Sequence, residues 1–228
     1  MSQTVQTEVE VAGGAVPVWV AGPSPEQASS LPGLVVIPSI FGAHDDLQAQ
    51  MRTVADVATT VIMDPFWREG GGAVPYADHA TAMGRLAEFD RQAAFADVAA
   101  VAAWTAAQTN GNLAALGICF GGPFVLLGAS SGMFTGGITW HGSRMESVLD
   151  RLGDVGPGPF RFHFGDADPI TPPEAIDAVR SHFAAHANTG IVVHPGAAHG
   201  FSHEGAAWDE AAAAAGLADV RAVLEAIA

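Results

Sequence analysis

Leu113-Ala-Ala-Leu-Gly-Ile-Cys-Phe-Gly-Gly122 is the stretch of this chain that decides its fold. The apolar run breaks at Gly117, presents Cys119, and passes through two more glycines into Pro123-Phe-Val-Leu-Leu127. This pattern predicts a buried strand, a sharp turn with the thiol at its apex, and then a helix, which is the cysteine version of a nucleophile elbow. The start of a helix favours an anionic thiolate. A buried structural cysteine is the commoner fate of a single thiol, but the strand-to-helix context favours the elbow.

The composition excludes several classes of protein. The chain has 228 residues, a formal net charge of −15, nine basic residues that are all arginine, and a single cysteine. So acidic a chain is not expected to bind nucleic acid or an anionic membrane. The lack of lysine excludes Schiff-base catalysis, a pyridoxal site and a Walker-type phosphate loop. One cysteine excludes an intramolecular disulfide and a multi-cysteine zinc site.

The sequence shows no targeting signal. Met1-Ser-Gln-Thr-Val-Gln-Thr-Glu8 has neither the basic nor the apolar segment of a secretory signal. No apolar run reaches the roughly 18 residues of a membrane span. We therefore expect a soluble, cytoplasmic protein.

Predicted strands and helices alternate along the chain. A β-hairpin is expected from residues 4–11 and 15–20, and a lid or pocket wall from the glycine-rich loop 64–76. The further strands are expected at 34–37, 61–63, 113–118, 137–140, 159–164 and 191–194. The helices are expected at about 45–59, 76–89, 91–108, from 123 onward, 146–152, 174–187 and 205–227. This order predicts an α/β fold: one domain over residues 1–228, with a mostly parallel central sheet, helices on both faces and an N-terminal β-hairpin.

Three chemically reactive side chains follow predicted strands in the order Cys119, Asp168, His199. Active sites of open α/β sheets lie at the carboxyl ends of the strands. Nucleophile, acid and base in this chain order are typical of α/β-hydrolases. Such chemistry needs a thiol to attack an acyl carbon, an imidazole to take its proton, and a carboxylate to fix the imidazole tautomer.

Neighbouring residues offer alternatives for two of these roles. Asp166 competes for the acid, and His194 and His203 compete for the base. The three histidines after the last strand could also suggest a metal site, but Gly200 argues against their presentation from one helix, and a metal site is not favoured.

Four segments resemble the dienelactone hydrolase family. They are Leu-Val-Val-Ile-Pro-Ser-Ile-Phe-Gly at 34–42, Gly-Ile-Cys-Phe-Gly-Gly at 117–122, Phe-Gly-Asp-Ala-Asp-Pro-Ile at 164–170 and Ala-Ala-His-Gly-Phe at 197–201. The resemblance implies an α/β-hydrolase fold, a Cys–Asp–His triad, activity on lactones or esters, and no metal or organic cofactor. By position, Cys119 would be the nucleophile, His199 the base and Asp168 its orienter. The backbone N–H groups of Ile40 and Phe120 would form the oxyanion hole.

The chain departs from the family pattern around the substrate. Ser39 stands where the best-known members have a glutamate that contacts the thiol. His203 stands where they have one substrate-binding arginine, and the position of the other falls near His79. We therefore expect a weaker preference for a free carboxylate on the substrate than those members have. The candidate substrate-binding residues are Ser39, Phe41, Trp67, His79, Arg85 and His203.

The sequence thus predicts a cysteine-dependent hydrolase of lactones or small esters, acting on a small-molecule substrate as a monomer or small homo-oligomer. One alternative is a non-catalytic or redox-sensing protein of the same fold with an oxidisable Cys119. Another is a general esterase or thioesterase without lactone preference.

Overall fold

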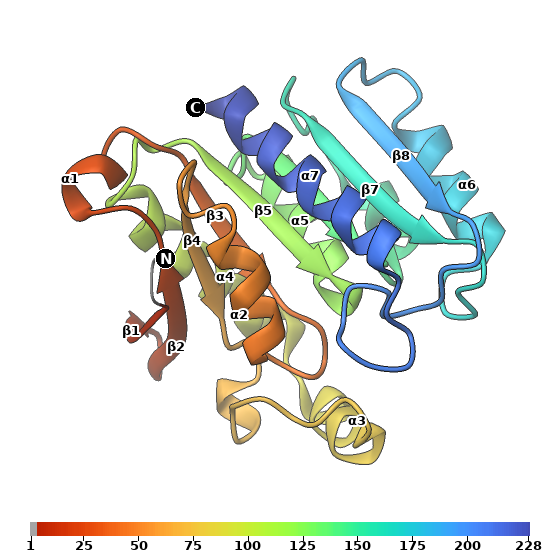
Figure 1. Ribbon diagram of the computed structural model, residues 1–228, viewed down its shortest axis with the longest axis horizontal. Coiled ribbons are helices and arrows are strands. Elements are labelled where there is room, and N and C mark those ends of the chain that lie inside the picture. Colours follow the sequence, from red (N-terminus) through yellow and green to blue (C-terminus); the bar gives the residue numbers. More distant parts are fainter. Residues whose placement is uncertain (1–3) are drawn as a thin grey trace.

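The computed structural model describes residues 4–228, which form one eight-stranded sheet between two layers of helices (Figure 1). The strands run in the spatial order β1-β2-β4-β3-β5-β6-β7-β8. They are β1 (Val5–Val11), β2 (Gly14–Ala21), β3 (Gly33–Ile37), β4 (Thr59–Met63), β5 (Leu113–Ile118), β6 (Gly136–Trp140), β7 (Phe160–Gly165) and β8 (Thr189–His194). From β4 to β8 every neighbouring pair is parallel, whereas β2 pairs antiparallel with both β1 and β4. The predicted mostly parallel sheet and N-terminal hairpin are confirmed.

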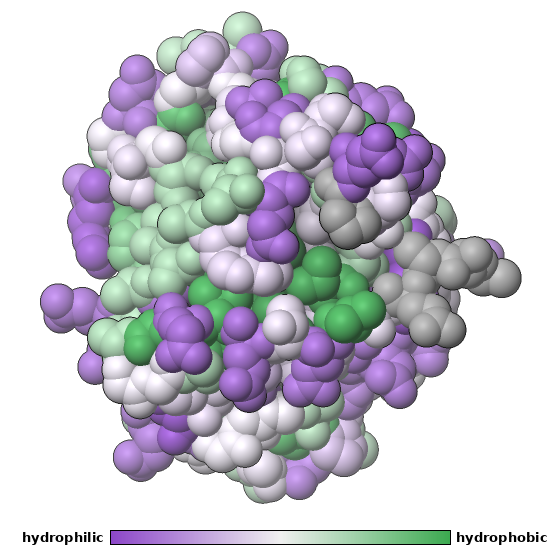
Figure 2. Space-filling view, turned by 90° about the vertical axis from the view of Figure 1, so that its left-hand side faces the viewer, coloured by the Kyte–Doolittle hydropathy of each residue, from purple (hydrophilic) through white to green (hydrophobic). Residues whose placement is uncertain are grey.

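The hairpin forms one edge of the sheet. Most of β1 is exposed, and Val5 keeps 62% of its surface. Figure 2 faces this side of the molecule and shows apolar residues reaching the surface between hydrophilic ones. The central strands β3, β4 and β5 are buried along their whole length, because helices cover both faces of the sheet.

Helices α2 and α7 cover one face of the sheet, and α4, α5 and α6 cover the other (Figure 1). Leu34 and Val36 of β3 pack toward α2 and α7, while Val35 and Ile37 pack toward α4 and α5. This alternation follows from the two-residue period of a strand. The helices are α1 (Pro25–Ala28), α2 (Asp45–Arg52), α3 (His79–Glu88), α4 (Arg91–Ala106), α5 (Gly122–Ser130), α6 (Pro173–His182) and α7 (Glu210–Ile227). Three 3-10 helices are η1 (Trp67–Glu69), η2 (Cys119–Gly121) and η3 (Met145–Arg151).

Several predicted helix ends are wrong. The helix expected at 45–59 ends at Arg52, because β4 already begins at Thr59. The helix expected at 174–187 ends at His182. The helix expected from 205 begins at Glu210, because the side chain of Asp209 accepts a hydrogen bond from the backbone N–H of Ala212 at 2.9 Å and caps the first turn. Of the helices within residues 4–228, none is long and apolar enough to cross a membrane.

Candidate active site

The backbone of Cys119 has the strained conformation that an elbow requires. Cys119 follows β5 directly, begins η2, and has a φ of 56°, in the left-handed region. Its carbonyl accepts a hydrogen bond from the backbone N–H of Ser143 at 2.9 Å. A Cβ at Gly121 would lie 2.5 Å from the carbonyl oxygen of Ile37, so glycine is required where η2 crosses the end of β3. The sequence forms the elbow here because its glycines permit this close approach.

Cys119, His199 and Asp168 lie in contact although they come from different strand ends. His199 Nε2 is 3.1 Å from Cys119 Sγ, and His199 Nδ1 is 2.7 Å from Asp168 Oδ2. Asp168 Oδ1 accepts hydrogen bonds from the backbone N–H groups of Ile170, at 2.7 Å, and Thr171, at 3.3 Å. The carboxylate is thereby held in one orientation, with one oxygen directed at the imidazole.

The competing residues have other partners. Asp166 Oδ1 accepts a hydrogen bond from the backbone N–H of Gly196 at 2.6 Å, in an exposed turn. His194 Nε2 is 3.0 Å from His163 Nδ1. The geometry therefore favours Asp168 and His199 over these neighbours.

The contacts of His199 alter its protonation. Burial lowers its pKa, but the hydrogen bonds with Asp168 and Cys119 outweigh burial and raise the pKa of His199 to about 10. An imidazole in this setting carries its proton at neutral pH and faces the sulfur with it. The pair can therefore hold a thiolate beside an imidazolium, which is the activated form of a cysteine nucleophile.

A hydroxyl close to the thiol belongs to a residue that the sequence analysis did not single out. Ser143 Oγ lies 3.9 Å from Cys119 Sγ. Ser39 is buried, and its Oγ accepts from the backbone N–H of Phe41 at 3.4 Å. The only signal for Ser143 in the sequence is its place three residues after the end of β6, which lies beside the end of β5.

Arg85 is bound to the loop after β3 and not directed at an open pocket. Its side chain is buried, and its Nε donates to the carbonyl of Ile40 at 3.0 Å. Its Nη1 donates to the carbonyl of Gly72 at 2.9 Å. The guanidinium thus joins the Ile40 loop to the glycine-rich loop, which had been expected to form a lid or pocket wall.

Phe41, His79 and His203 gather as an aromatic cluster with Tyr76. Phe41 meets His79 and His203 edge-on, at ring-centroid distances of 5.2 Å and 6.2 Å. Tyr76, which the sequence analysis did not single out, stacks on His203 at 4.8 Å. Burial and the neighbouring His199 charge lower the pKa of His203 to about 4, against a smaller opposite effect of Asp46. His203 is therefore neutral at pH 7 and cannot act there as the cation that the family places at this position.

Trp67, in the glycine-rich loop, faces the hairpin and α4. Its Nε1 donates to Asp97 Oδ2 at 3.0 Å, and the Arg68 guanidinium lies over its ring at 4.1 Å. The ring also fills the space beside Gly14 in the hairpin turn. These contacts join the loop to the hairpin and α4, and the structure brings Trp67 to none of the three reactive side chains.

Across residues 4–228, no group of three or more His, Cys, Asp or Glu side chains is arranged to hold a metal ion.

Comparisons with known proteins place this chain in a family. Residues 18–227 match the profile described as "Dienelactone hydrolase family". A Salmonella typhimurium protein named "Putative carboxymethylenebutenolidase" is 26% identical over 211 residues, which cover 86% of this chain and 77% of that protein. The carboxymethylenebutenolidase of a Pseudomonas species is 27% identical over 170 residues, which cover 72% of this chain and 70% of that protein.

Solved structures show the same architecture. A Klebsiella pneumoniae structure described as "Putative Dienelactone Hydrolase" superimposes with a TM-score of 0.84 at 22% identity, and the match covers 99% of each chain. A dienelactone hydrolase-like promiscuous phosphotriesterase from metagenomic libraries superimposes with a TM-score of 0.78 at 20% identity, over 99% of this chain and 98% of that one. The mostly parallel sheet with its antiparallel hairpin is thus an α/β-hydrolase fold. Since the family profile covers nearly the whole sequence, this chain belongs to the dienelactone hydrolase family.

Proposed function

We propose that this protein hydrolyses lactones or small carboxylic esters with Cys119 as its nucleophile. The observation that carries the proposal is the continuous line of contacts from Asp168 through His199 to Cys119, at 2.7 Å and 3.1 Å. A nucleophile in contact with a base that is itself oriented by a carboxylate is the general signature of acyl transfer. The relatives named carboxymethylenebutenolidase support a lactone as the substrate.

In the first half of the reaction, the Cys119 thiolate attacks the carbonyl carbon, and the carbonyl π electrons move to the oxygen. The backbone N–H groups of Ile40 and Phe120 donate to this oxyanion. When the tetrahedral intermediate collapses, the C–O bond to the leaving alkoxide breaks, and His199 Nε2 supplies the proton that the alkoxide takes up. For a lactone, the new hydroxyl stays attached to the acyl group through the opened ring.

In the second half, water hydrolyses the acyl-enzyme thioester. Neutral His199 takes a proton from the water as its oxygen attacks the carbonyl carbon. Collapse breaks the C–S bond, releases the carboxylic acid, and restores the thiolate beside the imidazolium. Asp168 holds the imidazole tautomer in both halves, since its Oδ2 accepts from Nδ1.

The loop that carries Ile40 is rigidly held, which supports its role in the oxyanion hole. Its turn is closed by a hydrogen bond from the N–H of Gly42 to the carbonyl of Ser39 at 2.9 Å. The buried Arg85 guanidinium binds the next carbonyl along, that of Ile40. Both bonds restrict the peptide whose N–H would face the substrate.

The test is turnover of a chromogenic para-nitrophenyl ester and of an aromatic lactone by wild type and by Cys119→Ala. We expect wild type to hydrolyse both, and the variant to lose activity while keeping its circular dichroism spectrum. Since Cys119 is the single cysteine, iodoacetamide modifies one site and should abolish activity as well. Full activity in Cys119→Ala would overturn the proposal. An inactive wild type whose thiol oxidises readily would favour the redox-sensing alternative, and equal rates on linear esters and lactones would favour a general esterase.

A further inference from the structure

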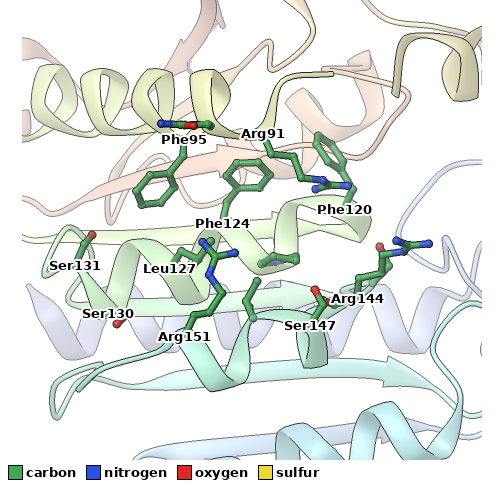
Figure 3. Close-up of a pocket in the computed structure, with 14 residues that line it drawn as sticks. Arg91, Phe95, Phe120, Phe124, Leu127, Ser130, Ser131, Arg144, Ser147 and Arg151 are labelled. Carbon is green, nitrogen blue, oxygen red and sulfur yellow. The ribbon is translucent and has the colours of Figure 1, made fainter. Parts of the chain in front are cut away.

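A cavity of about 690 Å³ opens beside the elbow and extends between α4, α5 and η3 (Figure 3). Phe120 and Ser143 line it, so the pocket begins at the residue after the nucleophile and at the hydroxyl 3.9 Å from its sulfur. Its volume lies within the roughly 300–1,000 Å³ of pockets that enclose small-molecule ligands. The cavity therefore lies next to the proposed site of reaction and is large enough for an arm of a substrate.

The charge of this cavity is opposite to that of the whole protein. Arg91, Arg144 and Arg151 line it, whereas none of the 24 acidic residues does. Three of the nine arginines in a chain of net charge −15 thus line one pocket. An anionic ligand is repelled by most of such a surface and attracted to this part of it.

The three guanidinium groups are not used by the fold. Within residues 4–228, none of them makes a hydrogen bond or an ion pair to another side chain or carbonyl, unlike the guanidinium of Arg85. Burial and the nearby positive charge of Arg144 lower the pKa of Arg91, so these two groups lie close enough to repel each other. All three side chains are exposed, so their guanidiniums are solvated and remain available to pair with an anion that enters the cavity.

The backbone at Arg144 is strained and lies next to a residue held by the elbow. Arg144 has a φ of 55°, in the left-handed region that non-glycine residues rarely adopt. The preceding residue, Ser143, is held by the elbow through its N–H bond to the Cys119 carbonyl. The backbone from which the Arg144 side chain extends is therefore held beside the elbow.

Apolar side chains also line the cavity. Phe95, Phe124 and Leu127 are among them, and Arg91 extends from α4 while Arg151 extends from η3 on the opposite side (Figure 3). Such a lining buries a hydrocarbon segment and leaves the charged end of a ligand to the arginines.

We propose that this pocket is an anion subsite, which receives an arm of the substrate whose apolar segment ends in an oxyanion group, a carboxylate or a phosphate. The proposal rests on the hydrolase function proposed above and specifies its substrate class. It differs from the weaker carboxylate preference expected from the sequence, because Arg91, Arg144 and Arg151 supply positive charge from other elements than those that carry His203 and Arg85.

The first experiment measures binding alone, in Cys119→Ala protein, by isothermal titration with hexyl phosphate, hexanoate and neutral hexanamide. We expect both anions to bind at least about tenfold more tightly than the amide. Arg144→Gln and Arg91→Gln should remove this advantage. Arg180→Gln is the matched control, because it removes one exposed positive charge on α6, outside the pocket. Comparison of the dissociation constants of hexyl phosphate and hexanoate shows which oxyanion the pocket prefers.

The second experiment connects the subsite to turnover. It compares kcat/KM for the para-nitrophenyl ester of hexanoic acid with that for the mono-para-nitrophenyl ester of adipic acid. Arg144→Gln should lower the ratio of kcat/KM for the adipate ester to kcat/KM for the hexanoate ester about tenfold.

The two proposals fail in different ways. If hexanamide binds as tightly as the anions, or if Arg180→Gln weakens anion binding as much as Arg144→Gln, the subsite is wrong even when the hexanoate ester is hydrolysed. If Arg144-dependent anion binding is found while wild type hydrolyses neither ester, the subsite stands and the proposed hydrolase function fails.

Discussion

At the scale of single residues, the site depends on the proton held between His199 and Cys119. The raised pKa of His199, about 10, has its cause in the two hydrogen bonds that oppose burial. A full positive charge in contact with sulfur favours the thiolate more strongly than the partial charges of a helix end do. Cys119 and Asp168 both contact this imidazole, so substitutions around it should show how its proton is held.

We expect iodoacetamide to alkylate Cys119 rapidly at pH 7, because the positively charged imidazole of His199 lies in contact with the sulfur. His199→Gln should slow the reaction at that pH more than about tenfold, because the imidazolium is lost. His182→Gln is the control, since His182 is exposed on α6. A His199→Gln protein that is alkylated as fast as wild type would contradict this role of His199.

Asp168→Asn should lower kcat about a hundredfold or more, because the amide no longer stabilises the imidazolium or fixes its tautomer. Asp166→Asn provides the comparison: it lies two residues away, and its Oδ1 accepts from the N–H of Gly196 at 2.6 Å, an interaction that an asparagine oxygen retains. Its kcat should stay near wild type. Equal losses in the two variants would refute the role of Asp168 as orienter.

At the scale of elements, the elbow requires β3, β5 and η2 to approach within backbone contact. The Cβ of an alanine at residue 117 would lie 2.5 Å from the Gly121 carbonyl oxygen. At residue 121 it would lie 2.5 Å from the Ile37 carbonyl oxygen. Backbone cannot give way as a flexible side chain does, so these glycines determine how closely the elements pack.

Gly121→Ala should lower the free energy of unfolding by about 2–3 kcal/mol, the cost of overpacking against a backbone atom. Gly84→Ala in α3 is the matched control, because a Cβ there meets no atom within 4 Å. It should raise the free energy of unfolding by about 0.5–1 kcal/mol through helix propensity. Urea denaturation measures both, and a Gly121→Ala protein as stable as wild type would show that the elbow can relax.

At the scale of the whole molecule, burial of histidines makes stability depend on pH. Burial, followed by the charges of His199 and His203, lowers the pKa of His141 well below its ordinary value. His203 is lowered from 6.5 to about 4. Both histidines come from loops at the carboxyl edge of the sheet and lie with ring centroids 5.1 Å apart. Folding thus brings together imidazoles that resist protonation.

The free energy of unfolding should fall as the pH drops from about 6.5 to about 4. In this window the unfolded chain protonates residue 203 and the folded chain does not, so acid favours unfolding, and above about 6.5 this contribution is constant. One such group changes stability by at most about 1.4 kcal/mol per pH unit. His203→Gln should reduce the slope by up to that amount, as chemical denaturation at several pH values would measure. An unchanged slope would contradict the assignment.

Much of the fold could be predicted from the sequence, because the signals for it are local. Leu34-Val-Val-Ile37 reads as a strand buried on both faces, and the glycines around Cys119 read as an elbow, since each depends on a few adjacent residues. The order Cys119, Asp168, His199 after successive strands places them at one edge of a parallel sheet. Helix ends were less predictable, because capping by Asp209 competes with the helix-favouring alanines around it.

The sequence by itself therefore determined the α/β fold, the elbow and the chain order of the three reactive residues. Each of these depends on patterns of a few adjacent residues. Only the tertiary structure decided that Ser143 lies beside the thiol, that Arg85 is bound to the Ile40 loop, and that Arg91, Arg144 and Arg151 meet at one pocket. These residues lie on different elements, far apart in the chain. Whether their side chains meet depends on strand register, on the packing of α4 against α5, and on a strained backbone at one residue, none of which adjacent residues specify.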